Sequence, residues 1–249
     1  MPSKETTLSI NASLTLRQLP SGLTFGTDAY LLAAFIKPKP KGRAVELGCG
    51  TGVISLLCAA YQKFKAIDAY EIQESYAGIA QKNCTDNSLD SIVNVRQQDI
   101  RTLRPTDACR EADAVFANPP YMKTTSGKRN EADEKYYARH EVFGTITDFC
   151  ECGSRMLKTG GSFYCVWRPD RITDLFCALR GARLEPKRIT FVFPDTASEP
   201  AVVLVESCKG GSSGAHVTKP LVIYRDAPGR DPRQTTEDFQ KVYETCTLY

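Results

Sequence analysis

The segment Asn118 to Tyr121 carries the groups needed to hold a flat molecule with an exocyclic amine. It follows the apolar run Ala114 to Ala117, and its two consecutive prolines can extend neither a helix nor a strand ladder. The sequence therefore predicts a rigid turn just beyond the end of a strand. This turn offers the side-chain amide of Asn118, carbonyl groups without matching N–H groups, and the aromatic ring of Tyr121. Taken alone, the same residues also fit a proline turn that only closes a strand.

A glycine-rich segment upstream is the second candidate for chemistry. Glu46 is followed by Gly48, Gly50 and Gly52 at alternate positions, and glycines allow the main chain to approach a ligand and to turn tightly into a helix. A dinucleotide site uses a similar loop, but its glycines are spaced G-x-G-x-x-G. The G-x-G-x-G spacing, together with the lack of a visible hydride-transfer partner, argues against a dehydrogenase.

Alternating strands and helices would bring both segments to one edge of a sheet. The predicted strands are residues 44–47, 65–70, 92–95, 113–117, 162–167, 188–193 and 201–206. The predicted helices between them are residues 52–61, 74–87, 146–157 and 169–180. This alternation predicts an α/β fold with a doubly wound, mostly parallel sheet of seven strands.

A hairpin and a helix are predicted before this alternation begins. Residues 14–19 and 23–25 are expected to pair as a hairpin, because a proline and a glycine break the apolar pattern between them. Residues 29–36 are expected to form a short helix that Thr27 or Asp28 caps.

The basic segment 37–43 is broken by prolines and is expected to be a solvated linker, with a nucleic-acid contact as the alternative. We therefore divide the chain into an N-terminal extension over residues 1–42 and one domain with a C-terminal tail over residues 43–249.

Polar side chains stand at the ends of successive predicted strands, where open α/β sheets bind their ligands. Glu71 ends the second strand, and its carboxylate can accept both hydroxyls of a ribose. Asp99 follows the third strand and could accept from an adenine amine while Ile100 packs on the ring. Asn118 ends the fourth strand. Glu46 and Glu71 could instead be polar strand ends and Asp99 a turn cap, but four such residues at four successive strand ends favour a ligand site.

The composition fits a globular protein without a membrane span. The 249 residues, 42% of them hydrophobic, can bury one large core or two small ones. No run of about 18 apolar residues occurs, and the N-terminus lacks the pattern of a secretory signal. We therefore expect a cytoplasmic protein. The net charge of +3 only weakly suggests a polyanionic partner.

The ten cysteines are scattered, and Cys150 and Cys152 form the single close pair. Two histidines, His140 and His216, are available to complete a metal site. Reduced cysteines explain this pattern better than structural zinc, so we expect no metal.

These motifs together resemble the class I S-adenosylmethionine-dependent methyltransferases that act on planar nitrogen. The motifs are the segment Glu46 to Gly52, Glu71, Asp99 and the segment Asn118 to Tyr121. The resemblance implies a Rossmann-like fold, S-adenosylmethionine as cofactor, and an adenine amine, a guanine amine or a glutamine amide as acceptor. The cofactor-binding residues that it implies are Glu46, Gly48, Gly50, Gly52, Glu71, Ile72, Asp99, Ile100 and Asn118.

The flanking segments are similar to one family within this class, the bacterial tRNA(Val) adenine-37 N6-methyltransferases. Phe25 to Asp28, followed by Leu31 to Phe35, looks like the entry segment of that family. The tail segments Val203 to Glu206, Lys209 to Gly211 and Lys219 to Tyr224 are also similar. This resemblance implies a tRNA substrate methylated at an adenine N6 amine in the anticodon loop, and we expect a monomer.

The catalytic residues in this interpretation are Asn118, Pro119 and Tyr121. The side-chain oxygen of Asn118 and the carbonyl of Pro119 would accept the two amine hydrogens, and Tyr121 would stack on the base. Methyl transfer from a sulfonium is an in-line displacement, so orientation is the main requirement. No general base is needed before transfer, because the proton leaves after the nitrogen has become cationic.

Further substrate contacts are expected on both sides of this turn. The proposed substrate-binding residues are Phe25, Thr27, Asp28, Tyr121, Lys123, Lys128, Arg129 and Lys209. The cationic segment 122–129 could form a lid that touches phosphates or an ordinary solvated loop. Lys209 could contact a phosphate or belong to an ordinary turn.

Three other functions remain open. Glutamine N5-methyltransferases that act on release factors share the turn but carry a longer helical N-terminal domain. Ribosomal RNA guanine-N2 methyltransferases often end the turn in Phe and often have a duplicated domain. A non-enzymatic nucleotide- or RNA-binding module would not need the intact Gly48, Gly50, Gly52 and Asn118.

Overall fold

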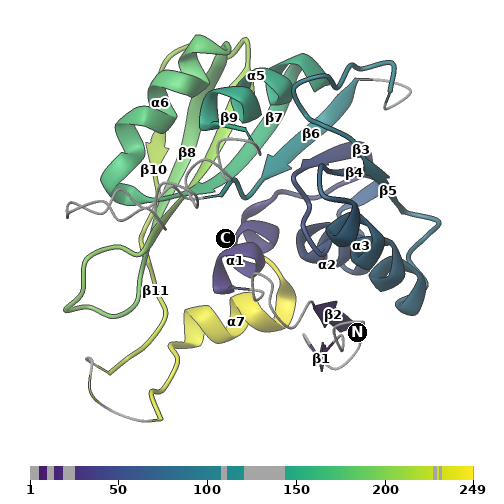
Figure 1. The fold of residues 1–249 in the computed structure, drawn as a ribbon. Coiled ribbons are helices and arrows are strands. Elements are labelled where there is room, and N and C mark those ends of the chain that lie inside the picture. The colour runs from purple at the N-terminus through teal and green to yellow at the C-terminus, as the bar shows by residue number, and fades with distance from the viewer. Residues whose placement is uncertain are drawn as a thin grey trace, which may run out of the picture.

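A nine-stranded sheet forms the centre of the computed structural model (Figure 1). Its main strands are β3 (Lys39–Leu47), β4 (Phe64–Glu71), β5 (Val93–Gln97), β6 (Ala112–Ala117), β7 (Leu157–Trp167), β8 (Leu184–Phe193) and β9 (Val202–Lys209). The structure describes residues 6–9, 14–18, 26–107, 111–120, 144–226, 229 and 232–248.

The strand order is β5, β4, β3, β6, β7, β9, β8, and within this series only β9 runs antiparallel to its neighbours. The predicted α/β class and the seven predicted strands are confirmed. Two further strands, β10 (His216–Val217) and β11 (Leu221–Val222), pair with β8. Each has two residues, which is too short to produce a recognisable apolar pattern.

Helices cover both faces of this sheet. On one face lie α1 (Thr27–Phe35), α2 (Val53–Ala60) and α3 (Glu74–Asp86), with α7 (Glu237–Thr245) packed against α1. On the other face lie α5 (Ile146–Met156) and α6 (Ile172–Gly181), the latter preceded by the 3-10 turn η1 (Pro169–Arg171).

Side chains alternate between two cores along the buried strands. On β9, Val203 and Val205 join the α5 and α6 core, whereas Val202 and Leu204 join the α1 and α2 core. Burial of both faces is what a mostly parallel sheet requires. Among the described residues, no helix combines the length and the apolar character needed to cross a bilayer.

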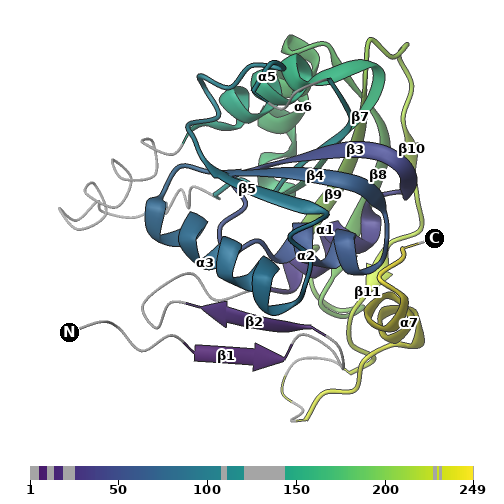
Figure 2. The same ribbon diagram turned by 90° about the vertical axis from the view of Figure 1, so that its right-hand side faces the viewer.

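The N-terminal hairpin differs from its prediction. Strand β2 (Thr15–Gln18) pairs with the upstream strand β1 (Thr6–Ser9) in antiparallel register, and the expected partner at residues 23–25 lies outside the described residues. The pairing was missed because Leu8 is the single apolar residue of β1. The hairpin lies beside α3 and apart from the main sheet (Figure 2).

Two other local predictions were wrong. Gly26 caps α1 with an extended backbone and no side-chain hydrogen bond, so neither Thr27 nor Asp28 is the cap. The expected linker instead begins β3, where Lys39 pairs with Phe64. A register shift before Arg43 accommodates the proline and glycine of this stretch.

Gly153 lets α5 approach β7 closely. A Cβ atom at this position would lie 2.5 Å from two ring carbons of Phe163, a fully buried side chain. Overpacking of this kind costs about 1–3 kcal/mol. We predict that Gly153→Ala lowers the free energy of unfolding by about that amount, measured by urea denaturation.

The matched control is Gly78→Ala on the exposed side of α3, where a Cβ would meet no atom within 4 Å. It should raise stability by roughly 0.5–1 kcal/mol, because alanine restricts the unfolded chain. Equal effects at the two positions would contradict the packing argument.

Candidate active site

A pocket lies where β3, β4 and β6 end, bounded also by α1, α3 and α5. This edge is where the predicted ligand site should be. The pocket is lined by Gly26, Ala29, Glu46, Gly48, Cys49, Gly50, Thr51, Val53, Ile54, Glu71, Ile72, Gln73, Tyr76, Asn118, Pro120 and Phe149.

The glycine-rich loop between β3 and α2 depends on backbone angles that other residues rarely adopt. Gly50 and Gly52 have φ of 54° and 84°. A Cβ at Gly52 would lie 3.2 Å from the Cβ of Ala80, whereas one at Gly50 would meet no atom within 4 Å. Gly52 therefore allows the loop to pack on α3, and Gly50 leaves open space in the pocket lining.

Glu71 fixes this loop through its carboxylate. Gly50 N donates to Oε2 over 2.9 Å, and Gln73 N donates to Oε1 over 2.9 Å. The residue is 5% exposed. Each carboxylate oxygen accepts more than one hydrogen bond, so Glu71 can hold the loop and still accept the hydroxyls of a ribose.

Glu46 is buried beside the same loop. Its Oε2 accepts hydrogen bonds from the main-chain N–H and the hydroxyl of Ser55. Burial raises the pKa of Glu46 to about 8, and the bonds from Ser55 oppose that rise. At neutral pH the group is therefore largely protonated. A cationic ligand group in the pocket would favour its charged form.

Asn118 and Pro120 bring the end of β6 into the pocket. The strand is held on both sides, since Ala117 pairs with Leu47 of β3 and with Cys165 of β7. Pro119, which lies between Asn118 and Pro120, is buried. The rigid turn predicted after β6 therefore places an amide side chain at the wall of the pocket.

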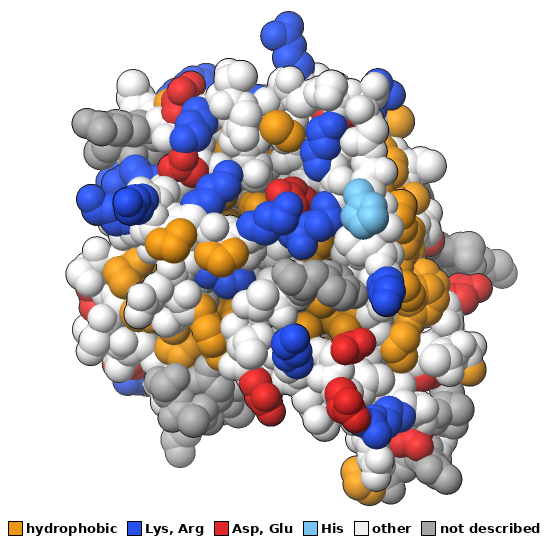
Figure 3. Space-filling model, turned by 180° about the vertical axis from the view of Figure 1, so that it is seen from behind, with side chains coloured by type: hydrophobic (Ala, Val, Ile, Leu, Met, Phe, Trp, Pro, Cys, Tyr) orange, Lys and Arg blue, Asp and Glu red, His pale blue; other side chains and the backbone are white. Residues whose placement is uncertain are grey.

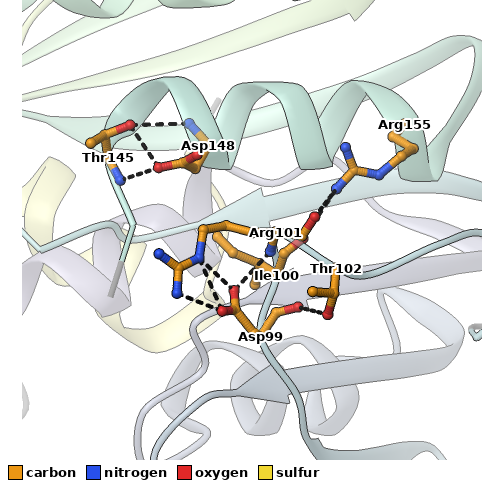
Figure 4. A network of polar contacts seen from close by, with 7 residues as sticks. All are labelled: Asp99, Ile100, Arg101, Thr102, Thr145, Asp148 and Arg155. Atoms are coloured by element: carbon orange, nitrogen blue, oxygen red, sulfur yellow. Dashed lines mark hydrogen bonds and ion pairs between the residues drawn. The ribbon is translucent and has the colours of Figure 1, made fainter. Parts of the chain in front are cut away.

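The carboxylate of Asp99 is paired with a neighbouring side chain (Figure 4). Its two carboxylate oxygens accept from the guanidinium of Arg101, with N···O distances of 2.6–3.0 Å. The Arg101 guanidinium holds the pKa of Asp99 below its usual value. Neither Asp99 nor Ile100 belongs to the described lining of the pocket, so their contact with adenine stays a prediction.

Lys209 does not lie with the other predicted site residues. It pairs with Leu184 at the start of β8, and its ammonium group donates to the carbonyl of Leu157 at the start of β7. Because β9 runs antiparallel, its carboxyl end lies at the amino ends of the parallel strands. The sequence could not show this reversal, and the structure separates Lys209 from Asn118.

The described lining of the pocket carries no positively charged side chain. Lys and Arg side chains gather near the middle of the face seen in Figure 3, whereas the described lining of the pocket includes none. The described part of the pocket thus suits a nucleoside better than a chain of phosphates.

The remaining predicted substrate residues fall in two groups. Thr27 and Asp28 form the first turn of α1, directly after Gly26 of the pocket lining. Outside the described residues lie Phe25, Tyr121, Lys123, Lys128 and Arg129.

Two aromatic side chains of the lining were not predicted. Tyr76 comes from the first turn of α3, and Phe149 comes from α5. A capping box between Thr145 and Asp148 starts α5 just before Phe149 (Figure 4). This T-x-x-D pattern was the signal that could have placed Phe149 near a helix start at the sheet edge. Tyr76 lies within the predicted helix 74–87, and no motif in that helix marked it as a ligand contact.

Among the described side chains, no group of three or more His, Cys, Asp or Glu residues could hold a metal ion. All described cysteines are free, and most are buried.

The family model for the methyltransferase small domain matches residues 22–174. One relative, the tRNA1(Val) (adenine(37)-N6)-methyltransferase of Dickeya chrysanthemi, is 27% identical over 220 residues, which cover 86% of this chain and 84% of the relative. The enzyme of the same name from Aliivibrio salmonicida is 26% identical over 140 residues, which cover 56% of this chain and 58% of the relative. The second match therefore spans less than two thirds of that relative's length.

Solved structures share the fold. A predicted O-methyltransferase from Agrobacterium tumefaciens superposes with a TM-score of 0.70 at 21% identity, covering 89% of this chain and 98% of that chain. The M. jannaschii TYW2 protein in complex with AdoMet gives a TM-score of 0.55 at 15% identity, covering 82% of this chain and 84% of that chain. At these identities the likeness shows the fold alone.

The raised pKa of Glu46 predicts a pH-dependent contribution to stability. Between pH 4.5 and about 8 the unfolded chain releases this proton while the folded chain keeps it. The free energy of unfolding should therefore fall as pH rises through this window, with a limiting slope of about 1.4 kcal/mol per pH unit.

Glu46→Gln, which is neutral at every pH, provides the comparison. Denaturant unfolding of both proteins from pH 5 to 8 should show the wild type losing stability relative to the variant. Parallel pH profiles would show that Glu46 titrates alike in the folded and unfolded chains.

Proposed function

The chain belongs to the methyltransferase small domain family, whose methyl donor is S-adenosylmethionine, and we propose that it methylates the N6 amine of an adenine in tRNA. The proposed position is adenine 37 in the anticodon loop of a tRNA(Val). One observation carries this proposal: Asn118 and Pro120 line the same pocket as the glycine-rich loop and Glu71.

The two ends of the pocket suit two different groups. Glu71 presents carboxylate oxygens that are fixed by two main-chain N–H groups, and these oxygens would accept the ribose hydroxyls of the donor. Tyr76 and Phe149 supply aromatic surface in the same lining. Asn118 marks the acceptor end, because it stands at the next strand end beyond Glu46 in the sheet order.

The acceptor chemistry follows from the nature of an adenine amine. Its lone pair is delocalised into the ring, so the nitrogen is a weak nucleophile. In our proposal Asn118 Oδ1 and the Pro119 carbonyl accept the two amine hydrogens, which directs the lone pair towards the methyl group. The amine hydrogen then leaves as a proton after transfer, so the residues act by orientation.

The choice of tRNA rests on the relatives and on the entry segment. The Dickeya and Aliivibrio relatives are named for adenine 37 of tRNA1(Val). Thr27 and Asp28 adjoin the pocket through Gly26, where they would meet the flipped nucleotide. Extrusion of a base costs least where it is already unpaired, as in an anticodon loop. A cytoplasmic monomer is part of the same proposal.

The test is methyl transfer from labelled S-adenosylmethionine to a tRNA(Val) transcript, followed by nucleoside mass spectrometry. We predict N6-methyladenosine with adenine at position 37 and none when that base is guanine. Asn118→Ala should lower the turnover number by roughly 100-fold, since misorientation of reacting groups costs about that much. S-adenosylhomocysteine should still bind this variant.

Two results would overturn the assignment. Near wild-type turnover in Asn118→Ala would remove Asn118 from the mechanism. Methylation of a release-factor glutamine or of a guanine, with tRNA adenine unmodified, would move the chain to another acceptor class.

A further inference from the structure

Side chains of α3 form hydrogen bonds with the edge of β2 that does not pair with β1. Thr15 N donates to Asn87 Oδ1 over 3.0 Å, and Asn87 Nδ2 donates to Thr15 O over 2.8 Å. Arg17 N donates to Asn83 Oδ1 over 2.7 Å, and Asn83 Nδ2 donates to Arg17 O over 3.2 Å. Two asparagine amides thus exchange paired hydrogen bonds with alternate residues of the strand.

This arrangement follows from the similar spacing of residues along the helix α3 and along the strand β2. Residues four apart on a helix lie on one face, about 6 Å apart along the axis. Alternate residues of a strand lie about 6.6 Å apart and point their N–H and C=O groups to the same side. Asn83 and Asn87 therefore meet the outward groups of Thr15 and Arg17, as a third strand would.

Asn83 has an additional contact with the pocket. Its Nδ2 also donates to the carbonyl of Thr51 over 2.9 Å, and Thr51 lines the pocket within the glycine-rich loop. The Asn83 side chain is fully buried. One amide group therefore bonds both to the hairpin and to the loop.

The hairpin depends on this docking for its structure. A two-stranded hairpin is marginally stable on its own in water, and β1 and β2 form a separate two-stranded sheet. Its other described anchors include the buried side chains of Leu14, Leu16 and Gln18 and an ion pair between Arg17 and Asp86. Docked and undocked states of this hairpin therefore differ by these hydrogen bonds and by the burial of these side chains.

We propose that Asn83 is a positioning residue that couples docking of the N-terminal hairpin to occupation of the glycine-rich loop by the methyl donor. A ligand that fixes the loop also fixes the Thr51 carbonyl, and so the amide that binds Arg17. Coupling is reciprocal, so the docked hairpin strengthens ligand binding by the same factor. This inference rests on the proposed function, because it takes the pocket as the donor site.

Hydrogen exchange of the full chain, read by mass spectrometry on peptides covering residues 14–18, tests the coupling. The amide hydrogens of Thr15 and Arg17 report docking directly, because they are donated to the two asparagines. Saturating S-adenosylhomocysteine should slow their exchange by roughly fivefold or more, the lower end of usual coupling. Unchanged exchange with the ligand bound would overturn the inference.

Asn83→Ala and Asn87→Ala form a matched pair for the same measurement. Each variant loses one pair of hydrogen bonds to β2. Of the two asparagines, only Asn83 also donates a hydrogen bond to Thr51. Both variants should exchange faster than the wild type. The ligand effect should vanish in Asn83→Ala and persist in Asn87→Ala, and an equal ligand effect in the two would contradict the role of Asn83.

Calorimetry separates this inference from the proposed function. S-adenosylhomocysteine should bind Asn83→Ala more weakly than wild type by the same factor by which it slows wild-type exchange. Absence of binding to the wild-type protein would refute the donor site itself. Binding without any change in hairpin exchange would refute only the coupling.

Discussion

The pocket depends on the Glu71 carboxylate, which joins the glycine-rich loop to the end of β4. It accepts one N–H from Gly50 and one from Gln73, so a single side chain fixes both sides of the gap between two strand ends. The loop is also tied to β4 by Cys49 N, which donates to Tyr70 O over 2.9 Å. The loop glycines have positive φ angles, and glycine has little intrinsic preference for this backbone shape over others. These hydrogen bonds therefore determine the shape of the loop.

The rest of the fold places the other lining residues of the pocket around the Glu71 carboxylate. The parallel strands β3, β4 and β6 end at one edge, which brings Glu46, Glu71 and Asn118 within one lining. Both faces of the sheet are buried, so the strand ends are held from two cores. Helix α1 completes the pocket with Gly26 and Ala29 and is itself packed against α2 and α7. The N-terminal segment before β3 thus contributes to the same site as the sheet.

Much of this arrangement was predictable because it depends on strong local patterns. Apolar runs marked the seven main strands, and strand–helix alternation implied that most of them are parallel. Glu71 and Asn118 could be located as polar residues at strand ends. Other features depend on contacts between particular side chains, and the sequence pattern does not indicate these contacts. Arg101, two residues along the chain from Asp99, donates hydrogen bonds to the Asp99 carboxylate. No periodicity in the sequence predicts this pairing.

Other features of the structure could not be predicted from the sequence for equally specific reasons. Lys209 was separated from the pocket by the antiparallel direction of β9, which the sequence does not encode locally. Tyr76 lines the pocket because α3 packs beside the loop through Ala80 and Asn83, a tertiary contact. The hairpin partner of β2 was not predicted because β1 is mostly polar and its partner strand β2 is the one that packs against α3.

Calorimetric titration with S-adenosylhomocysteine tests the central claim most directly, that Glu71 organises a donor site at the carboxyl edge of the sheet. The wild-type protein should bind one equivalent, and Glu71→Ala should bind at least about 10-fold more weakly, since a hydrogen bond to a charged group is worth about 1.5–3 kcal/mol. Glu74→Ala, a change at an exposed carboxylate on the first turn of α3, should bind as the wild type does. Equal affinity of the wild type and Glu71→Ala, or no binding by the wild type, would contradict the claim.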